Sequence, residues 1–510
     1  MNDRHLVRIL LVAGALMAVL ASTPYAMFDL ARFLAPKELV LNSVAAVAAL
    51  LCLRRAKEFK PDAVDLLLAA YLSLSLLSAL MARDLWLSSS ALAVSLSGAA
   101  VFWAARASAG NGGRNAIVAG VAAAAVAGAA ASLLQAYGVS SDFFSQNRIP
   151  GGTMGNRNFM AHLSVICLPA LILTTLRVGR PWALLACLAS MAVVCDALVL
   201  SRSRAALLGL AAGMAALGYG AWRARARWGD VRTVSRLKAL LAAGILGVLA
   251  ALFIPNTLQW KSDSPYLDTV SGIVNYREGS GRGRLVQYAT TLRMSVSHPL
   301  FGVGPGNWML EYPKFSEYFD PSMDYYTGLT INPWPSNDWL GILSERGAPA
   351  LAAILLALLG LLLRAWKQDA DAQSWQEGLV LSATLVITAT VACFDAVLVL
   401  PAASYAAWAL FGALAPSLPV RCLVRLSPRA GGRILLAAAL LGGAAVLRSC
   451  GQVAALALAS KARTASQVAA AARLDPGNIN IRLRLAANAK VVRNERKGLS
   501  GWVRGLWNRP

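Results

Sequence analysis

Residues 181–222 read PWALLACLASMAVVCDALVLSRSRAALLGLAAGMAALGYGAW, two long apolar runs separated by SRSR at 201–204. An α-helix of roughly 20 apolar residues is long enough to cross about 30 Å of hydrocarbon, so each run is predicted to span a membrane. The stretch therefore predicts a pair of membrane helices, and it places Arg202 and Arg204 in the turn that joins them.

The same pattern fills most of the chain, which has 510 residues, of which 57% are hydrophobic and 14% charged. Ordinary soluble proteins carry about 25% charged residues. We therefore predict an all-α, polytopic membrane protein of about 12–13 transmembrane helices. The candidate spans lie near residues 9–25, 39–53, 62–82, 87–105, 115–137, 158–176, 181–200, 205–222, 239–255, 346–363, 378–399, 401–417 and 433–449. The first has the basic start and short apolar stretch of a secretory signal, but an uncleaved first helix is the preferred interpretation.

The basic residues predict the orientation, because loops rich in Lys and Arg stay cytoplasmic. With the N-terminus inside, the basic groups at 54–60, 223–238 and 421–433 all fall on the cytoplasmic side. The long insert before the tenth span and the tail then lie outside, and an even number of helices would move only the tail. The net charge of +23 is explained mostly by this topology. It favours contact with anionic membrane lipids rather than nucleic acid.

Four regions follow: transmembrane helices 1–9 over residues 1–255, a periplasmic loop over 256–336, helices 10–13 over 337–449 and a basic helical tail over 450–510. The loop is long and rich in aromatic residues, which is typical of a functional segment. The tail holds LDPGN at 474–478 between two helix-like stretches, a pattern similar to part of a tetratricopeptide repeat. A solvated end without a fixed fold is the alternative. The seven cysteines, Cys52, Cys167, Cys187, Cys195, Cys393, Cys422 and Cys450, are expected to be small buried hydrophobes.

Polar residues gather at the predicted outer ends of the helices, where ionisable groups are costly and usually functional. Asn158 and His162 lie at the start of the sixth span, and Asp196 and Asp395 lie near the outer ends of two others. The arginines at 202 and 204 stand in an outer turn, against the usual distribution of basic residues. Their planar guanidinium groups suit phosphate, so we expect them to bind it. The alternative is a structural ion pair with Asp196 or Asp395.

The outer loop holds a second pair, Arg282 and Arg284, followed by HPLFGVGPGNW at 298–308. Its glycines predict a tight turn, and no Gly-Lys-Ser/Thr follows that would make it a nucleotide-binding loop. Two arginine clusters with aromatic residues such as Trp308 nearby suggest a site for a diphosphate that carries sugars.

Four blocks in this order resemble the O-antigen ligase and polymerase superfamily: GNRNFMA at 155–161, SRAALLG at 203–209, Arg284 through HPLFGVG at 298–304, and SNDWL at 336–340 through ERG at 345–347. The resemblance covers about residues 60–415. It implies a bacterial inner-membrane glycosyltransferase that moves a glycan from an undecaprenyl-diphosphate carrier to an acceptor hydroxyl on the periplasmic face, without metal or cofactor. The first outer loop offers only Asp29 and Glu38, well apart, where metal-dependent transferases carry paired acids.

The resemblance, in which Arg204 and Arg284 take the places of the family arginines thought to hold the diphosphate, and the polar residues described above together predict the site residues. Catalytic roles are expected for Arg204, Arg284, Asp338 and Ser336, and substrate contacts for Arg202, Arg282, Asn158, His162, Asn337 and Trp308. The chain departs from the ligases in one place, because Ser336 stands where they carry a histidine that acts on the acceptor. Serine does not accept a proton near neutral pH as imidazole does, so Asp338, Glu311 and His298 are candidates to replace it.

The choice between ligase and polymerase stays open at this point. A ligase transfers the glycan to the lipid A core, whereas a polymerase transfers it to another lipid-linked repeat in lipopolysaccharide or exopolysaccharide synthesis. A polysaccharide transporter or lipid-glycan flippase is the rival class, but the chain has no internal repeat of the kind that such folds show. A structural membrane subunit is the third possibility.

Overall fold

A computed structural model describes residues 3–28, 30–110, 112–223, 231–260, 262–275, 279–324, 328–366, 372–415 and 423–487. Asp29, Cys422, parts of two predicted basic loops and the last residues of the tail lie outside this part of the chain. The described chain is built of helices, which confirms the all-α prediction. Its strands are two short antiparallel pairs, β1 (Glu58–Phe59) with β4 (Val424–Arg425) and β2 (Met323–Asp324) with β3 (Leu329–Thr330).

Each of the predicted spans coincides with a helix. These helices are α1 (Asp3–Leu20), α2 (Ala31–Leu53), α3 (Ala63–Leu80), α4 (Leu85–Ser108), α5 (Gly113–Ala136), α6 (Arg157–Arg177), α7 (Pro181–Ser201), α8 (Arg204–Arg223), α9 (Val231–Phe253), α13 (Asp338–Ala365), α14 (Ala372–Ala392), α15 (Pro401–Leu414) and α16 (Pro428–Lys461). Among the described helices, 11 are long and apolar enough to cross a membrane. The two others are α1, whose first turns carry charges, and α15, which has only 14 residues.

The predicted boundaries are wrong at several helix ends, among them the starts of α2 and α9 and the end of α16, and two of these differences lie close to the candidate site. Helix α13 begins at Asp338 rather than near 346, and Gly347, with φ 83° and ψ 170°, breaks it into two parts. Helix α14 ends at Ala392 rather than near 399, and residues 393–400 form a turn before α15. Both differences arise from hydrogen bonds between segments distant in sequence, which hydropathy does not report.

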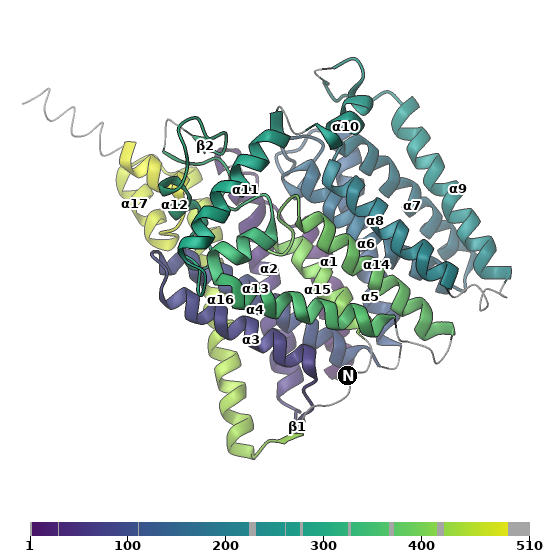
Figure 1. Ribbon diagram of the computed structural model, residues 1–510, viewed down its shortest axis with the longest axis horizontal. Coiled ribbons are helices and arrows are strands. Elements are labelled where there is room, and N and C mark those ends of the chain that lie inside the picture. The colour runs from purple at the N-terminus through teal and green to yellow at the C-terminus, as the bar shows by residue number, and fades with distance from the viewer. Residues whose placement is uncertain are drawn as a thin grey trace, which may run out of the picture.

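The remaining elements gather at one end of the bundle, which we call the loop end. Figure 1 shows α10 (Pro265–Val274), α11 (Gly279–Ser297), α12 (Trp308–Glu311) and α17 (Ala465–Leu474) there, with β1 at the opposite end. Three short 3-10 helices also lie between the α-helices: η1 (Ala26–Phe28), η2 (Gly152–Met154) and η4 (Tyr312–Lys314). The pairing of β1 with β4 joins two segments that were both predicted to be cytoplasmic.

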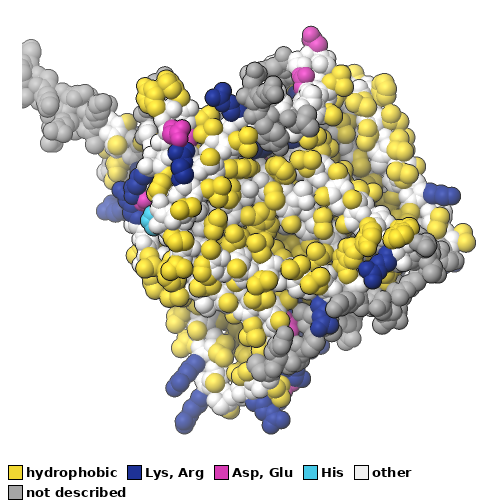
Figure 2. Space-filling model, viewed as in Figure 1, with side chains coloured by type: hydrophobic (Ala, Val, Ile, Leu, Met, Phe, Trp, Pro, Cys, Tyr) yellow, Lys and Arg dark blue, Asp and Glu magenta, His cyan; other side chains and the backbone are white. Residues whose placement is uncertain are grey.

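The outside of the bundle suits a lipid environment. Figure 2 shows hydrophobic side chains over the middle of the molecule and Lys and Arg side chains projecting at its lower end. Inside, α15 is buried along its whole length, and α6 is buried over most of its length. Small residues permit this close packing: a Cβ at Gly412 would stand 2.2 Å from the carbonyl oxygen of Phe102.

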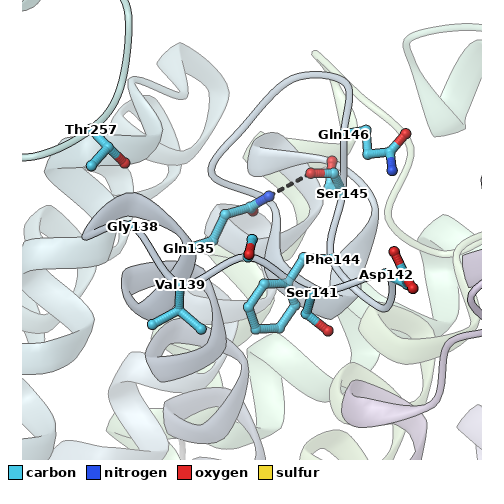
Figure 3. A pocket seen from close by; sticks show the side chains of 10 residues that line it. Gln135, Gly138, Val139, Ser141, Asp142, Phe144, Ser145, Gln146 and Thr257 are labelled. Carbon is cyan, nitrogen blue, oxygen red and sulfur yellow. Dashed lines mark hydrogen bonds between the residues drawn. The ribbon is translucent and has the colours of Figure 1, made fainter.

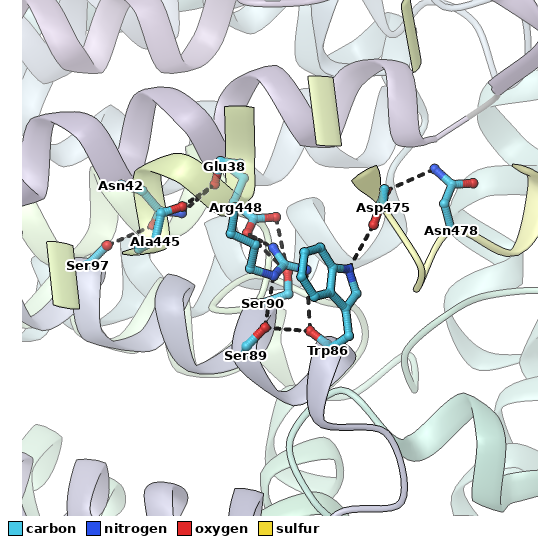
Figure 4. Close-up of polar contacts among 11 residues, drawn as sticks. Glu38, Asn42, Trp86, Ser89, Ser90, Ser97, Ala445, Arg448, Asp475 and Asn478 are labelled. Atoms are coloured by element: carbon cyan, nitrogen blue, oxygen red, sulfur yellow. Dashed lines mark hydrogen bonds and ion pairs between the residues drawn. The ribbon is translucent and has the colours of Figure 1, made fainter. Parts of the chain in front are cut away.

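The first residues of the tail dock on the loop end. Leu456, Val468 and Ile481 form a hydrophobic cluster with Phe28 of η1 and Ala35 of α2. Polar contacts fix this arrangement, as Figure 4 shows. The indole Nε1 of Trp86 donates to Asp475 Oδ1 at 2.9 Å; Arg448 pairs with Glu38 at 2.9 Å and donates to Ser89 Oγ at 2.9 Å.

The cysteines that the structure describes are free. Cys167 and Cys187 are buried and Cys52, Cys195 and Cys393 are half-buried, largely as predicted, but Cys450 is exposed on the part of α16 that continues past its predicted span.

Candidate functional site

The turn between α7 and α8 holds the first arginine pair in a defined geometry. Arg202 adopts the left-handed conformation with φ 54°, which side chains other than Gly and Asn rarely adopt and which costs roughly 1–2 kcal/mol. Its Nε donates to Thr269 Oγ1 in α10 at 2.8 Å, and its guanidinium carbon lies 4.8 Å from the ring centroid of Trp260. Strained backbone of this kind is concentrated at functional sites.

Arg204 begins α8 and reaches the same helix. Its Nη1 donates to the carbonyl of Gly272 in α10 at 2.6 Å, and a Cβ at Gly272 would stand 2.5 Å from its guanidinium carbon. Burial lowers the pKa of Arg202, the charge of Asp268 raises it, and the charge of Arg204 lowers it. The two arginines are thus held by α10 close enough for their charges to repel each other.

Neither arginine forms the ion pair with Asp196 or Asp395 that was the structural alternative. Within the described residues, the Asp196 carboxylate instead accepts a hydrogen bond from the Tyr137 hydroxyl at 3.1 Å. Burial, together with the charge of Asp196, raises the pKa of Tyr137 to about 12. Among the described residues, neither arginine forms an ion pair with a carboxylate, although the charge of Asp268 acts on Arg202.

The first motif block builds the start of α6 beside these arginines. Gly155 has φ 80°, and Asn156 caps the helix by accepting from the backbone of Asn158 at 3.0 Å. This cap positions Arg157, whose guanidinium carbon lies 5.9 Å from the Trp260 ring centroid that Arg202 also faces. The Trp260 indole thus lies near one arginine from α6 and one from the turn between α7 and α8, and the charges of Arg148, Arg202 and Arg204 all act on Arg157.

His162 and Asp395 lie at the centre of the arrangement. His162 is fully buried, its Nε2 lies 3.5 Å from Ser203 Oγ and 3.9 Å from Asp395 Oδ2, and its Nδ1 has no partner among the described residues. Asn158 Nδ2 donates to the same carboxylate oxygen at 3.4 Å. Asp395 is therefore the acid that faces both α6 and the turn between α7 and α8.

Arg284 approaches the same place from α11. Its charge acts on His162 and on Tyr288, one turn further along α11. Its guanidinium forms no hydrogen bond or ion pair with any residue that the structure describes. A half-buried arginine without a protein partner is well placed to bind an anion.

The SND block at 336–338 fixes α13 against the turn at 393–400. Asn337 caps α13 and donates to the Cys393 carbonyl at 2.9 Å, and Asp338 Oδ2 accepts from the backbones of Val397 and Leu398 at 2.8 and 2.7 Å. The Tyr288 hydroxyl donates to the carbonyls of both Ser336 and Cys393. These bonds favour a structural role for Asp338, whereas Ser336 lies half-buried beside the site.

The glycine-rich block at 298–308 forms hydrogen bonds with α13 beside its break at Gly347. The backbones of Val303 and Gly304 donate to the carbonyls of Ser344 and Glu345 at 2.9 Å each. Trp308 is completely buried below this turn, where its backbone donates to Glu345 and its indole donates to Thr291 at 3.1 Å. The structure therefore does not bring Trp308 to the arginines, and its ring faces are not open to a sugar.

Two other candidates make contacts outside this arrangement. Glu311 pairs with Lys314 and lies 3.5 Å from Arg83, and His298 is exposed with its ring against Phe315. Arg282 is exposed on α11.

Sequence reasoning missed Arg148 and Arg157. Arg148 has φ 54°, as Arg202 does, in the connection before α6. Both lie on the predicted outer side, where basic residues are unusual. The same reasoning that identified Arg202 and Arg204 therefore also applied to these two arginines. Asp395 was noted among the polar residues at the predicted outer helix ends and as a pairing partner but was not predicted as a site residue, and its position beside His162 depends on the turn that hydropathy misplaced. No three His, Cys, Asp or Glu side chains come together in a possible metal site within the described ranges.

A comparison with known protein families finds a match in the middle of the chain. Residues 186–355 match the family model described as O-antigen ligase. The match contains Arg202, Arg204, Arg284 and Ser336, and it confirms the predicted resemblance to the O-antigen ligase and polymerase superfamily. No curated protein matches the chain.

Proposed function

We propose that the protein is a periplasm-facing glycosyltransferase of the bacterial inner membrane, because residues 186–355 match the O-antigen ligase family model. It moves a glycan from undecaprenyl diphosphate to a hydroxyl of an acceptor glycan, in lipopolysaccharide or exopolysaccharide synthesis. The reaction needs no metal, because arginines take the part that a cation would have in stabilising the leaving group.

The observation that carries the proposal is the convergence of unneutralised arginines at the loop end. Arg157, Arg202, Arg204 and Arg284 come from α6, the turn after α7, α8 and α11, and their charges act on one another or on His162 between them. Like charges gathered without ion pairs to carboxylates among the described residues are costly unless an anion joins them. Preorganised donors of this kind stabilise charge that develops on a departing diphosphate.

In the transfer, the acceptor oxygen forms a bond to the anomeric carbon of the donor while the bond from that carbon to the diphosphate oxygen breaks. The bonding electrons leave with the diphosphate, which Arg204 and Arg284 hold, with Arg202 and Arg157 beside them. The hydroxyl proton goes to Asp395, oriented by Asn158 and His162. Asp395 takes the role foreseen for Asp338, because the latter's carboxylate already accepts two backbone N–H groups.

Both a ligase and a polymerase fit this chemistry, and the absence of a histidine at position 336 favours the polymerase. The lipopolysaccharide and capsule bands of a deletion strain separate them. Capped core without polymer indicates a lost polymerase, whereas accumulated lipid-linked polymer indicates a lost ligase. Uncapped core, with the lipid-linked donor trapped on the cytoplasmic side, would favour the alternative of a flippase.

The direct test is glycan transfer by the purified protein supplied with lipid-linked donor and acceptor, with and without a chelator. We expect equal rates, and we expect Asp395→Asn to lose most of the rate while its thermal midpoint stays near that of the wild type. A requirement for metal would contradict the proposed mechanism. Reporters fused after Thr330 and after Arg227 should read periplasmic and cytoplasmic respectively, and the opposite pattern would contradict the orientation.

A further inference from the structure

A pocket of about 580 Å³ opens beside the connection between α5 and α6. Figure 3 shows the side chains around it, and its lining consists of Gln135, Gly138, Val139, Ser140, Ser141, Asp142, Phe144, Ser145, Gln146 and Thr257. Its volume falls in the range of roughly 300–1,000 Å³ that is typical of small-molecule sites.

The lining chemistry suits a hydroxyl-rich ligand rather than a phosphate. It contains hydroxyl, amide and carboxylate groups and one aromatic ring, and it contains no Lys or Arg. The Asp142 carboxylate accepts hydrogen bonds from hydroxyls and repels anions. The Phe144 ring offers an apolar surface of the kind against which the C–H face of a sugar ring packs.

Buried polar side chains hold the pocket loop in one conformation. Arg32 is only 2% exposed, and its two terminal nitrogens donate to the carbonyls of Asp142 and Phe144 at 2.9 and 2.7 Å. The amide oxygen of Gln135 accepts from the backbones of Gly151 and Gly152, and its nitrogen donates to the Ser145 carbonyl. A pocket fixed in this way loses little conformational entropy when a ligand binds.

The pocket also adjoins the arginine site. Thr257, in its wall, donates from its backbone and its hydroxyl to the Ala136 carbonyl at 2.9 Å. Three residues further, Trp260 packs on the same hydrophobic cluster as Leu258 and receives the guanidinium of Arg202. The short segment from Thr257 to Trp260 therefore connects the pocket, whose lining has no Lys or Arg, to the arginine site.

We propose that this pocket binds a hydroxyl-rich, uncharged glycan unit while the arginines bind the diphosphate. The pocket and the arginines would then bind the two chemically different parts of a lipid-linked glycan. That the glycan is part of a substrate rests on the proposed function. The glycan belongs either to the donor or to the acceptor, and the two sources are distinguished by kinetics.

Binding is measured first, without catalysis. The probe is the oligosaccharide released by mild acid from the lipid-linked glycan of the source cells, titrated into full-length protein in nanodiscs and followed by saturation-transfer NMR. The variants are Asp142→Ala/Gln146→Ala and, as an independent change that fills the pocket, Ser140→Trp. Glu317→Ala is the control, since it removes an exposed carboxylate of the loop end that pairs with Arg293.

We expect both pocket variants to weaken binding about ten-fold or more and the control to leave it unchanged. Inorganic pyrophosphate should not displace the oligosaccharide. Equal binding by wild type and both pocket variants, or no binding by folded wild type, overturns the inference. A KM that rises for the donor alone assigns the pocket to donor glycan, and one that rises for the acceptor alone assigns it to acceptor glycan. Oligosaccharide binding in a protein that transfers nothing would refute the proposed function and leave the pocket in place.

Discussion

Arg284→Lys tests the diphosphate role with little disturbance of the fold. Arg284 is half-buried on α11, and it makes no hydrogen bond or ion pair within the described residues, so its replacement removes no stabilising protein contact. Lysine keeps the charge but loses the planar fork that makes two parallel bonds to phosphate. The variant should therefore fold normally and transfer slowly.

The loss can be estimated from one missing bond. A hydrogen bond to a charged group is worth about 1.5–3 kcal/mol, and each 1.4 kcal/mol corresponds to about ten-fold in rate. If the bond forms fully only to the departing diphosphate, kcat should fall about 10- to 150-fold with a small change in KM. The thermal midpoint should stay within about 2 °C of the wild type, since no protein contact is lost.

The assay is glycan transfer by purified variants in nanodiscs, with thermal unfolding followed in parallel. Arg293→Lys is the matched control, because Arg293 lies on the same helix and makes an exposed ion pair with Glu317 at 2.6 Å. Such pairs contribute about 0.2–1 kcal/mol to stability, so both its rate and its unfolding should remain near the wild type. Wild-type turnover in Arg284→Lys, or a loss of folded protein equal to the loss of rate, would refute the reasoning.

Three further changes test the framework around the site. Asp338→Asn should be more damaging than Ser336→Ala, with a lower thermal midpoint, because it weakens two buried charge-assisted bonds; transfer rates and unfolding curves of the two variants decide this. Gly347→Ala should reduce the folded yield, since its φ is 83° and a Cβ would stand 2.1 Å from a backbone oxygen, and normal yield by size-exclusion chromatography would contradict it. Arg448→Met should cost about 3–5 kcal/mol of unfolding free energy by leaving Glu38 buried and unpaired, and adding Glu38→Gln should recover most of it.

Most of the membrane helices could be predicted from local sequence. A helix forms all its backbone hydrogen bonds within its own segment, and apolar side chains suit both lipid and the protein interior. The errors occurred where helix ends depend on distant partners. The end of α14 is set by the bonds from Val397 and Leu398 to Asp338, and the break in α13 by the loop that pairs with its backbone at Ser344 and Glu345. Neither interaction leaves a trace in local hydropathy.

The candidate site was partly predictable for a similar reason. Charge in an unexpected place identified Arg202, Arg204 and His162, because a buried or misplaced charge is costly whatever the tertiary contacts are. An aromatic residue gives no such signal, because the same ring can pack against a bound sugar or in the hydrophobic core. Trp308 was therefore predicted at the substrate and instead packs under the loop, while Trp260 takes the position between two arginines.

The glycine-rich motif acts at a distance from the chemistry. Gly304 pairs with the backbone just before the break at Gly347, and the turn delivers Trp308 to a buried site where its indole bonds Thr291 on α11. Thr291 lies two helical turns from Arg284 on the same helix, so this bond helps to set the depth and rotation of the helix that carries the arginine. A transferase that relies on arginines to stabilise a leaving group needs them within a fraction of an ångström of their place. In the proposed mechanism, the glycines therefore act through the position of Arg284.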